Sequence, residues 1–164
     1  MNLNPQWHFR ALLFWLVLMA GLYFAFDRYL APTVVAVSAP NDGEIVIPRS
    51  RDGHYYLAGS INGQPVTFLV DTGATVVSVS RALATAAGLP GGYPTTFNSA
   101  NGSRKGELVA NQSVEAGGVV VGPIDVAVGL DLGRADLALL GQNFLKRMDM
   151  IQRDDLLTLR IRTR

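Results

Sequence analysis

Short β-prone runs separated by turn signals make up most of this chain, and this pattern limits the folds open to it. From residue 53 onward the sequence has no long amphipathic helix and no regular alternation of strands with helices. Asn62-Gly63 lies between two such runs and is a strong hairpin signal. The pattern predicts a mostly β domain, a closed β-barrel with one or two short helices.

Further elements follow from the same local signals. Ser80 is a candidate N-cap for a short alanine-rich helix that ends near Gly88. We predict a second hairpin with its tip near Asn101-Gly102, a third that turns at Gly122-Pro123, and strands around Asp154-Asp155 at the end of the chain.

An uncharged apolar run, ALLFWLVLMAGLYFAF, occupies residues 11–26. As a helix it extends about 24 Å, against about 30 Å of bilayer hydrocarbon. Aromatic and charged residues flank it on both sides, as is typical of membrane interfaces. A secretory signal peptide is the alternative, but its apolar region normally spans about 7–15 residues. We therefore interpret residues 1–30 as an uncleaved membrane anchor that leaves the rest of the chain on the extracytoplasmic (periplasmic) side.

Residues 31–52 contain three prolines among small and polar residues. This composition predicts a linker, with one strand near residues 44–47. The folded domain is then expected to span residues 53–164.

Composition excludes several functional classes. Hydrophobic residues make up 49% and charged residues 16%, which favours a folded core, and a net charge of +1 argues against a nucleic-acid partner. The absence of cysteine excludes disulfides, thiol nucleophiles and cysteine-bound zinc. With only two histidines, a Ser–His–Asp triad or a multi-histidine metal site is not expected.

One carboxylate stands out within the segment TFLVDTGATVVSVS, residues 67–80. Asp71 follows an apolar strand directly, a costly place for a charge unless the charge is used. Gly73 allows a tight bend whose backbone N–H reaches the acid, and Thr72 supplies a hydroxyl. Asp71 is therefore the candidate catalytic residue, although Asp-Thr-Gly is also ordinary turn chemistry.

Two such aspartates that face each other can share a proton and activate a water. Two unit charges about 3 Å apart repel by about 5.5 kcal/mol at an effective dielectric constant of ~20, so one of the two stays protonated over a broad pH range. The chain contains a single Asp-Thr-Gly. The second aspartate must therefore come from another copy of the chain, across a two-fold axis.

The segment FLVDTGATVVSVS resembles the active-site strand and turn of retropepsin-like aspartic proteases. LALLGQNFL, residues 137–145, is similar to the second conserved element of that family, and NSANGSRKGE falls where the family has a mobile flap. The order of the three segments fits across residues 53–162. The N-terminal apolar segment adds a similarity to the membrane-anchored members found in bacteria.

The resemblance implies an endopeptidase that acts on proteins or peptides as a homodimer, with Asp71 of each subunit holding the attacking water. It implies that Thr72 joins the two active-site turns, that Gly73 positions the carboxylate, and that Ala74 completes the turn. It implies no metal and no cofactor. The resemblance places three residues near the flap tip, namely Ala100, Asn101 and Gly102. It places three others beneath the active site, namely Leu139, Leu140 and Gly141.

The sequence departs from the viral pattern. Thr75-Val76 stands where an acidic residue is common and Gln142 where an arginine is common, so we expect a weak dimer that membrane confinement assists. Ala74 replaces a hydroxyl residue of pepsin-like relatives, which predicts a mildly acidic pH optimum. The alternative functions are a non-catalytic, membrane-tethered dimeric binding module of the same fold and an unrelated β-barrel interaction domain.

Overall fold

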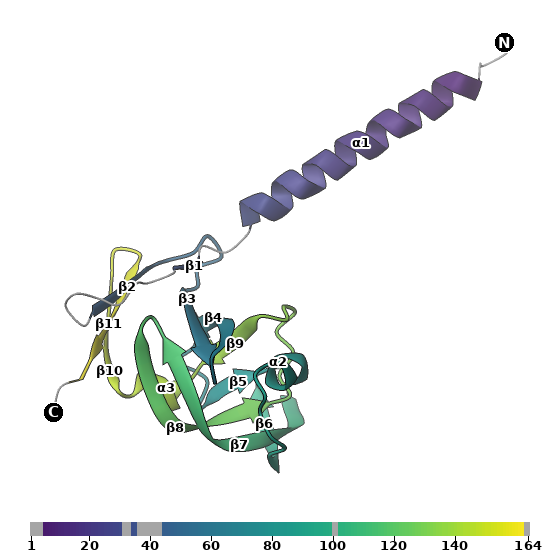
Figure 1. The fold of residues 1–164 in the computed structure, drawn as a ribbon. Helices are drawn as coiled ribbons and strands as arrows, with labels where there is room; N and C mark the ends of the chain where they lie inside the picture. The colour runs from purple at the N-terminus through teal and green to yellow at the C-terminus, as the bar shows by residue number, and fades with distance from the viewer. Residues whose placement is uncertain (1–4, 31–33, 36–43, 100–101, 163–164) are drawn as a thin grey trace. The chain divides into compact units, whose positions relative to one another are not determined.

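The computed structural model describes residues 5–30, 34–35, 44–99 and 102–162. The chain divides into two units, Met1–Pro32 and Thr33–Arg164, which are described separately here. Figure 1 shows their elements: α1 (Pro5–Leu30), β1 (Val34–Val35), β2 (Glu44–Pro48), β3 (Tyr56–Ile61), β4 (Gln64–Val70), β5 (Val77–Val79), α2 (Arg81–Ala86), β6 (Tyr93–Ser99), β7 (Gly102–Ala116), β8 (Val119–Val128), β9 (Leu137–Leu140), α3 (Gln142–Leu145), β10 (Met148–Arg153) and β11 (Leu156–Ile161).

The first unit is the single helix α1. Within it, Trp7–Leu30 forms a stretch of 24 residues that is long and apolar enough to cross a membrane. The predicted span of residues 11–26 lies inside this helix. A signal sequence near an N-terminus can pass the same test of length and composition, so this helix by itself is weak evidence for a membrane anchor. The side of the membrane stays a prediction.

The second unit is built around a closed barrel. Strands follow the order β3-β4-β9-β5-β8-β7 around it, and pairing between β3 and β7 completes the circle. Closure at this seam requires a glycine, because a Cβ on Gly59 would lie 2.1 Å from the carbonyl oxygen of Glu115. Strand β6 extends the sheet beyond β7, and β1 pairs with β3. The predicted mostly β barrel with few helices is confirmed.

A smaller sheet, in the order β10-β11-β2, lies beside the barrel (Figure 1). Its strand β2 corresponds to the strand predicted near residues 44–47. Ile45 and Ile47 of β2 are 1% and 0% exposed, so this strand belongs to the core. The compact unit therefore begins at Thr33, earlier than the boundary that we predicted at residue 53.

The prediction of a third hairpin that turns at Gly122-Pro123 was wrong. Strand β8 runs through this dipeptide, and the turn lies at Gly117 and Gly118, both with positive φ. The ladder between β7 and β8 changes register between Gln112 and Val114, opposite the proline. Proline lacks the N–H that a regular ladder needs, so a register change can accommodate it inside a strand.

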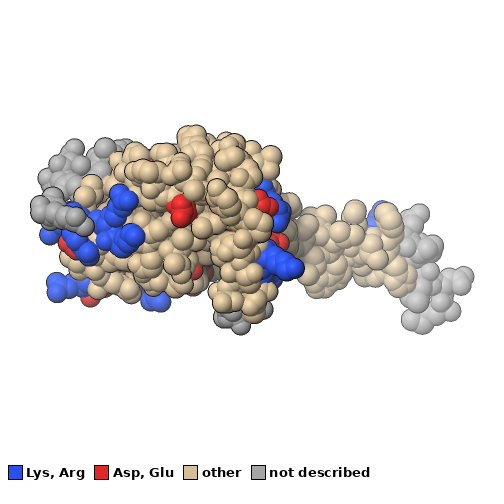
Figure 2. Space-filling view, turned by 90° about the horizontal axis from the view of Figure 1, so that it is seen from below, with Lys and Arg blue, Asp and Glu red and all other residues tan. Residues whose placement is uncertain are grey.

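The core of the second unit is mainly apolar, with four buried polar residues among those that the structure describes: Ser50, Thr67, Ser78 and Gln112. Its largest fully buried side chains are Phe68, Phe144, Ile45, Ile47, Leu57, Ile61, Leu140, Leu145 and Leu159. On the face in Figure 2, basic and acidic side chains lie next to each other at two places, with a wide, mainly uncharged area between them that carries an acidic patch. The strands that carry the candidate site are thus held by a packed interior rather than by surface charge.

Candidate active site

Asp71 lies at the point where β4 leaves the barrel. Strand β9 runs parallel to β4, with Val70 opposite Leu140, and the backbone N–H of Asp71 donates to the carbonyl of Leu140 at 3.2 Å. Leu140 is fully buried. The carboxylate therefore stands on a rigid pair of central strands.

The turn after Asp71 is closed by the acid itself. The backbone N–H of Gly73 donates to Oδ1 of Asp71 at 2.8 Å, and the N–H of Ala74 donates to the carbonyl of Asp71 at 3.3 Å. The Thr72 side chain is exposed. The sequence predicted this bond from Gly73, since the N–H two residues beyond an aspartate commonly bonds its side chain in a turn.

The residues at the start of α3 pack against the turn and form hydrogen bonds with it. Gly141 precedes the helix, and a Cβ there would lie 2.4 Å from the backbone of Val76. The N–H of Gln142 donates to the carbonyl of Ala74 at 2.8 Å, and Nε2 of Gln142 donates to the carbonyl of Thr72 at 3.1 Å. Gln142, which the sequence marked as a departure, thus holds the active-site turn of its own chain.

The side chain of Asn143, the next residue of α3, makes two further hydrogen bonds close to this turn. Its Oδ1 accepts from the N–H of Val77 at 2.9 Å, and its Nδ2 donates to the carbonyl of Asp125 at 2.7 Å. The side chain joins α3 to β5 and β8. Sequence reasoning did not single out Asn143, because its partners lie 66 and 18 residues away.

A cleft of about 580 Å³ opens over the carboxylate. Asp71, Gly73, Ala74 and Leu139 line it on the barrel side. The hairpin of β6 and β7 contributes the opposite side, through Thr96, Phe97, Asn98 and Arg104. This hairpin has the position expected of a flap. Arg104 and Phe97 were not among the predicted site residues, because their place in the cleft depends on the register of β6 with β7.

Glu107 fixes the base of the hairpin. Its Oε2 accepts from the N–H of Gly92 at 3.2 Å, and its Oε1 pairs with Arg81 of α2 at 3.0 Å. The hydrogen bond from Gly92, and then that from Arg81, lowers the pKa of Glu107 below its usual value. The hairpin therefore has an anchored base, while its paired strands reach over the cleft.

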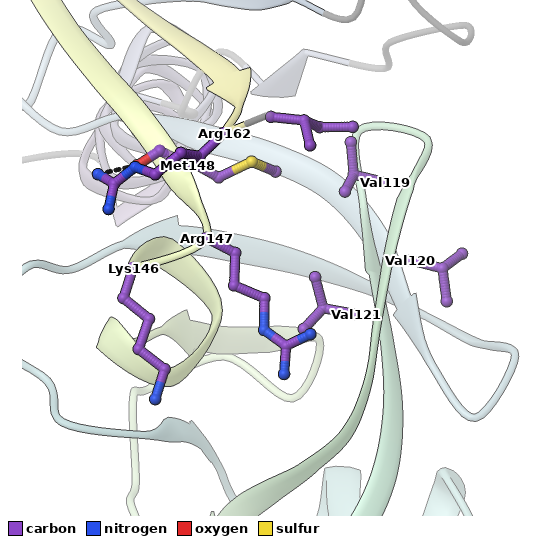
Figure 3. Close-up of a pocket in the computed structure, with 8 residues that line it drawn as sticks. Val119, Val120, Val121, Lys146, Arg147, Met148 and Arg162 are labelled. Carbon is purple, nitrogen blue, oxygen red and sulfur yellow. Dashed lines mark hydrogen bonds between the residues drawn. The ribbon is translucent and has the colours of Figure 1, made fainter. Parts of the chain in front are cut away.

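A second hollow, of about 940 Å³, is larger than the cleft but does not contain Asp71 (Figure 3). It lies between the start of β8, the segment after α3 and the end of β11. The charged residues that line it are basic, namely Lys146, Arg147 and Arg162. Because no carboxylate of the described chain lines this hollow, the smaller cleft is the candidate site for acid–base hydrolysis.

The predicted site residues take different places. Asp71 lines the cleft with its turn and Leu139, whereas Leu140 and Gly141 lie beneath it in the packed interior. Gly102 begins β7 with φ +100°. Ala100 and Asn101 lie outside the described residues. No group of three or more potential metal ligands occurs within the residues that the structure describes.

Comparisons with known proteins agree with this geometry. The family model for the gag-polyprotein putative aspartyl protease matches residues 57–147, more than half of the chain. The crystal structure of a retropepsin-like aspartic protease from Rickettsia conorii has 34% sequence identity and a TM-score of 0.62 with this chain. The match covers 73% of this chain and 91% of the Rickettsia conorii chain.

The chain therefore belongs to the retropepsin-like aspartic protease family. An uncharacterized protein of Rickettsia prowazekii (strain Madrid E) is 32% identical over 155 residues, 88% of this chain. An uncharacterized protein of Sinorhizobium sp., from the cobV 5′ region, is 29% identical over 137 residues, 80% of this chain. The chain spans 66% and 58% of the lengths of these two relatives. Family membership confirms the resemblance and supports a protease in general terms.

Proposed function

We propose that this protein is an aspartic endopeptidase in which Asp71 of each of two identical subunits activates the water that attacks a peptide bond. One carboxylate takes a proton from the water while the other, protonated, donates to the substrate carbonyl. The observation that carries the proposal is the Asp71 carboxylate, held by the N–H of Gly73 at 2.8 Å on the floor of a cleft. Family membership supplies the reaction class.

The need for a second subunit follows from the residues that line the cleft. Asp71 is the single carboxylate among the described residues that line it. One ionised carboxylate cannot act as acid and base in the same step. Thr72, at the turn, has an exposed side chain available to a partner's turn. Thr72 and Gly73 are the proposed turn supports, and the hairpin around residues 100–102 is the proposed flap.

The proposed organisation places residues 1–30 in the membrane and the protease domain in the unit Thr33–Arg164, which includes β2. The protease would then face the extracytoplasmic side. Membrane confinement raises the effective concentration of one subunit near another, which favours dimerisation. The proposed substrates are proteins or peptides within reach of the membrane.

The test uses the full chain in uncharged detergent micelles with a mixed peptide library at about pH 4 to 7, a range that includes the mildly acidic optimum predicted from the sequence. We expect cleavage by the wild type and none by Asp71→Asn or Asp71→Ala. Addition of an equal amount of Asp71→Asn chains to the wild type should leave about half of the wild-type rate, since mixed dimers carry one aspartate. Cleavage that survives either substitution would overturn the mechanism.

Dimerisation is measured separately, by sedimentation in the same micelles. A stable dimer that binds library peptides without cleaving them would favour the non-catalytic binding module instead. Cleavage by a strictly monomeric wild type would refute the shared site.

A further inference from the structure

Arg104 places a positive charge in the cleft that contains Asp71. Of the described residues that line this cleft, Asp71 and Arg104 are the two that carry a formal charge. Arg104 lies on β7, directly opposite Phe97 of β6. We infer that Arg104 makes the cleft selective for peptides with a glutamate or aspartate side chain that points toward the hairpin of β6 and β7. This inference rests on the proposed function, because it specifies the substrate of the same site.

The guanidinium of Arg104 is available to a ligand. Its side chain is exposed, and no carboxylate in the described part of the chain pairs with it. Five described arginines of the same unit have an acidic neighbour within 4.0 Å, namely Arg49, Arg81, Arg134, Arg160 and Arg162, whereas Arg147, in the second hollow, has none among the residues that the structure describes. Arg104 differs from the five paired arginines because it lines a cleft with no acid beside it.

The surroundings of Arg104 favour an ion pair with a bound peptide. Phe97 covers the glycine beside it, since a Cβ on Gly106 would lie 2.7 Å from the Phe97 ring. Leu130 and Leu139 line the same cleft. A peptide that fills this cleft displaces water, and a planar guanidinium then binds a carboxylate through two parallel hydrogen bonds.

The position of Asp71 decides where the acidic side chain lies. Asp71 repels a substrate carboxylate, whereas Arg104 attracts it. The acidic side chain therefore lies toward the hairpin and away from the reacting carbonyl. In a two-fold dimer each subunit supplies one Arg104, so one acidic subsite is expected on each side of the scissile bond.

The test uses the full chain in uncharged micelles and peptides blocked at both ends, so that no terminal carboxylate is present. The peptides form matched pairs that differ in Glu against Gln at one position. For at least one position we expect about a tenfold preference for Glu in both kcat/KM and Kd, equivalent to about 1.4 kcal/mol. The preference should fall at high salt, because the pair is partly exposed.

Three variants separate a charge effect from a loss of folding. Arg104→Gln should abolish the preference, and Arg104→Glu should reverse it in favour of Lys at the same position. Lys105→Gln is the matched control, since Lys105 is the exposed neighbour on β7 that does not line the cleft. Persistence of the Glu preference in Arg104→Gln, or its loss in Lys105→Gln, overturns the inference. So does a preference that appears only for peptides with a free C-terminus, which would assign Arg104 to a terminal carboxylate.

Binding to the Asp71→Asn variant separates this inference from the proposed function. A Glu preference in peptide binding, without any cleavage by the wild type, supports the role of Arg104 and overturns the protease proposal. Cleavage that depends on Asp71 but shows no Glu preference overturns the role of Arg104 alone. If no peptide is bound and none is cleaved, both the role of Arg104 and the protease proposal are overturned.

Discussion

Replacement of Asn143 by alanine should destabilise the unit that carries the active-site turn by about 3 kcal/mol. The Asn143 side chain accepts from the N–H of Val77 at 2.9 Å and donates to the carbonyl of Asp125 at 2.7 Å. Each lost hydrogen bond costs about 1 kcal/mol, and a buried donor left without a partner costs about 1–3 kcal/mol. Val77 is 0% exposed, so water cannot replace the bond to its N–H, and the full free-energy cost of an unpartnered buried donor applies. Asp125 is half-buried, and water replaces part of its lost bond.

The measurement is urea unfolding of the full chain in micelles. All variants carry Asp71→Asn, which removes any self-cleavage. Trp7 and Trp15 both lie in α1, so tryptophan fluorescence does not report on the β unit. The far-ultraviolet dichroism of the sheets is followed instead. With an m-value of about 2 kcal/mol/M, a loss of about 3 kcal/mol lowers the urea midpoint by about 1.5 M.

Gln142→Ala is the matched control for this experiment. Gln142 is the adjacent residue, and its side chain makes one hydrogen bond, to the carbonyl of Thr72 at 3.1 Å. A partly exposed single bond predicts a loss of about 0.5 kcal/mol. A loss below about 0.5 kcal/mol for Asn143→Ala, or an equal loss for both variants, would refute the argument from buried partners.

Three further variants test other contacts in the same unit. The hydrogen bond from Arg134 lowers the pKa of Asp136, so the stability that this carboxylate adds is present at neutral pH and is lost as the pH falls below about 4; Asp136→Asn should flatten the acid limb of a stability–pH curve. Burial, and then the hydrogen bond to Asp52, raises the pKa of Tyr56 to about 12, so stability should fall as the pH rises from about 10 toward 12; Tyr56→Phe should remove this alkaline loss in the same titration. Gly141→Ala should lower both the melting temperature and peptide cleavage, since the new Cβ would meet backbone at 2.4 Å, and a wild-type melting temperature would contradict this.

Local signals in the sequence were sufficient for several elements. Asn62 and Gly63 adopt φ of +50° and +83°, as a tight hairpin turn between β3 and β4 requires. The side chain of Ser80 caps α2, with the N–H of Leu83 donating to its Oγ at 3.1 Å. In both cases the deciding interaction lies within a few residues, so composition at that point determines the conformation.

Features that depend on distant pairing were not accessible in the same way. Gly122-Pro123 has the composition of a turn, yet β8 continues through it because β7 pairs with β8 on both sides of the irregularity. Asn143 acts through partners in β5 and β8 that only the fold brings together. The local sequence around Arg104 is typical of an exposed strand of a hairpin. Its place in the cleft follows from the position of the whole hairpin.

The arrangement around Asp71 also bears on the proposed shared site, of which one chain would supply a rigid half. The turn is held by its own strand, by β9 and by α3, through hydrogen bonds to Leu140, Ala74 and Thr72. These contacts fix the direction of the carboxylate, but none of them provides a second proton-transfer group. A rigid, singly charged half-site gains acid–base chemistry only by meeting a second carboxylate in fixed geometry. If the proposed dimer forms the site, loss of the bond from Gln142 to Thr72 should impair cleavage more than dimerisation, because it loosens the turn that aligns the two aspartates.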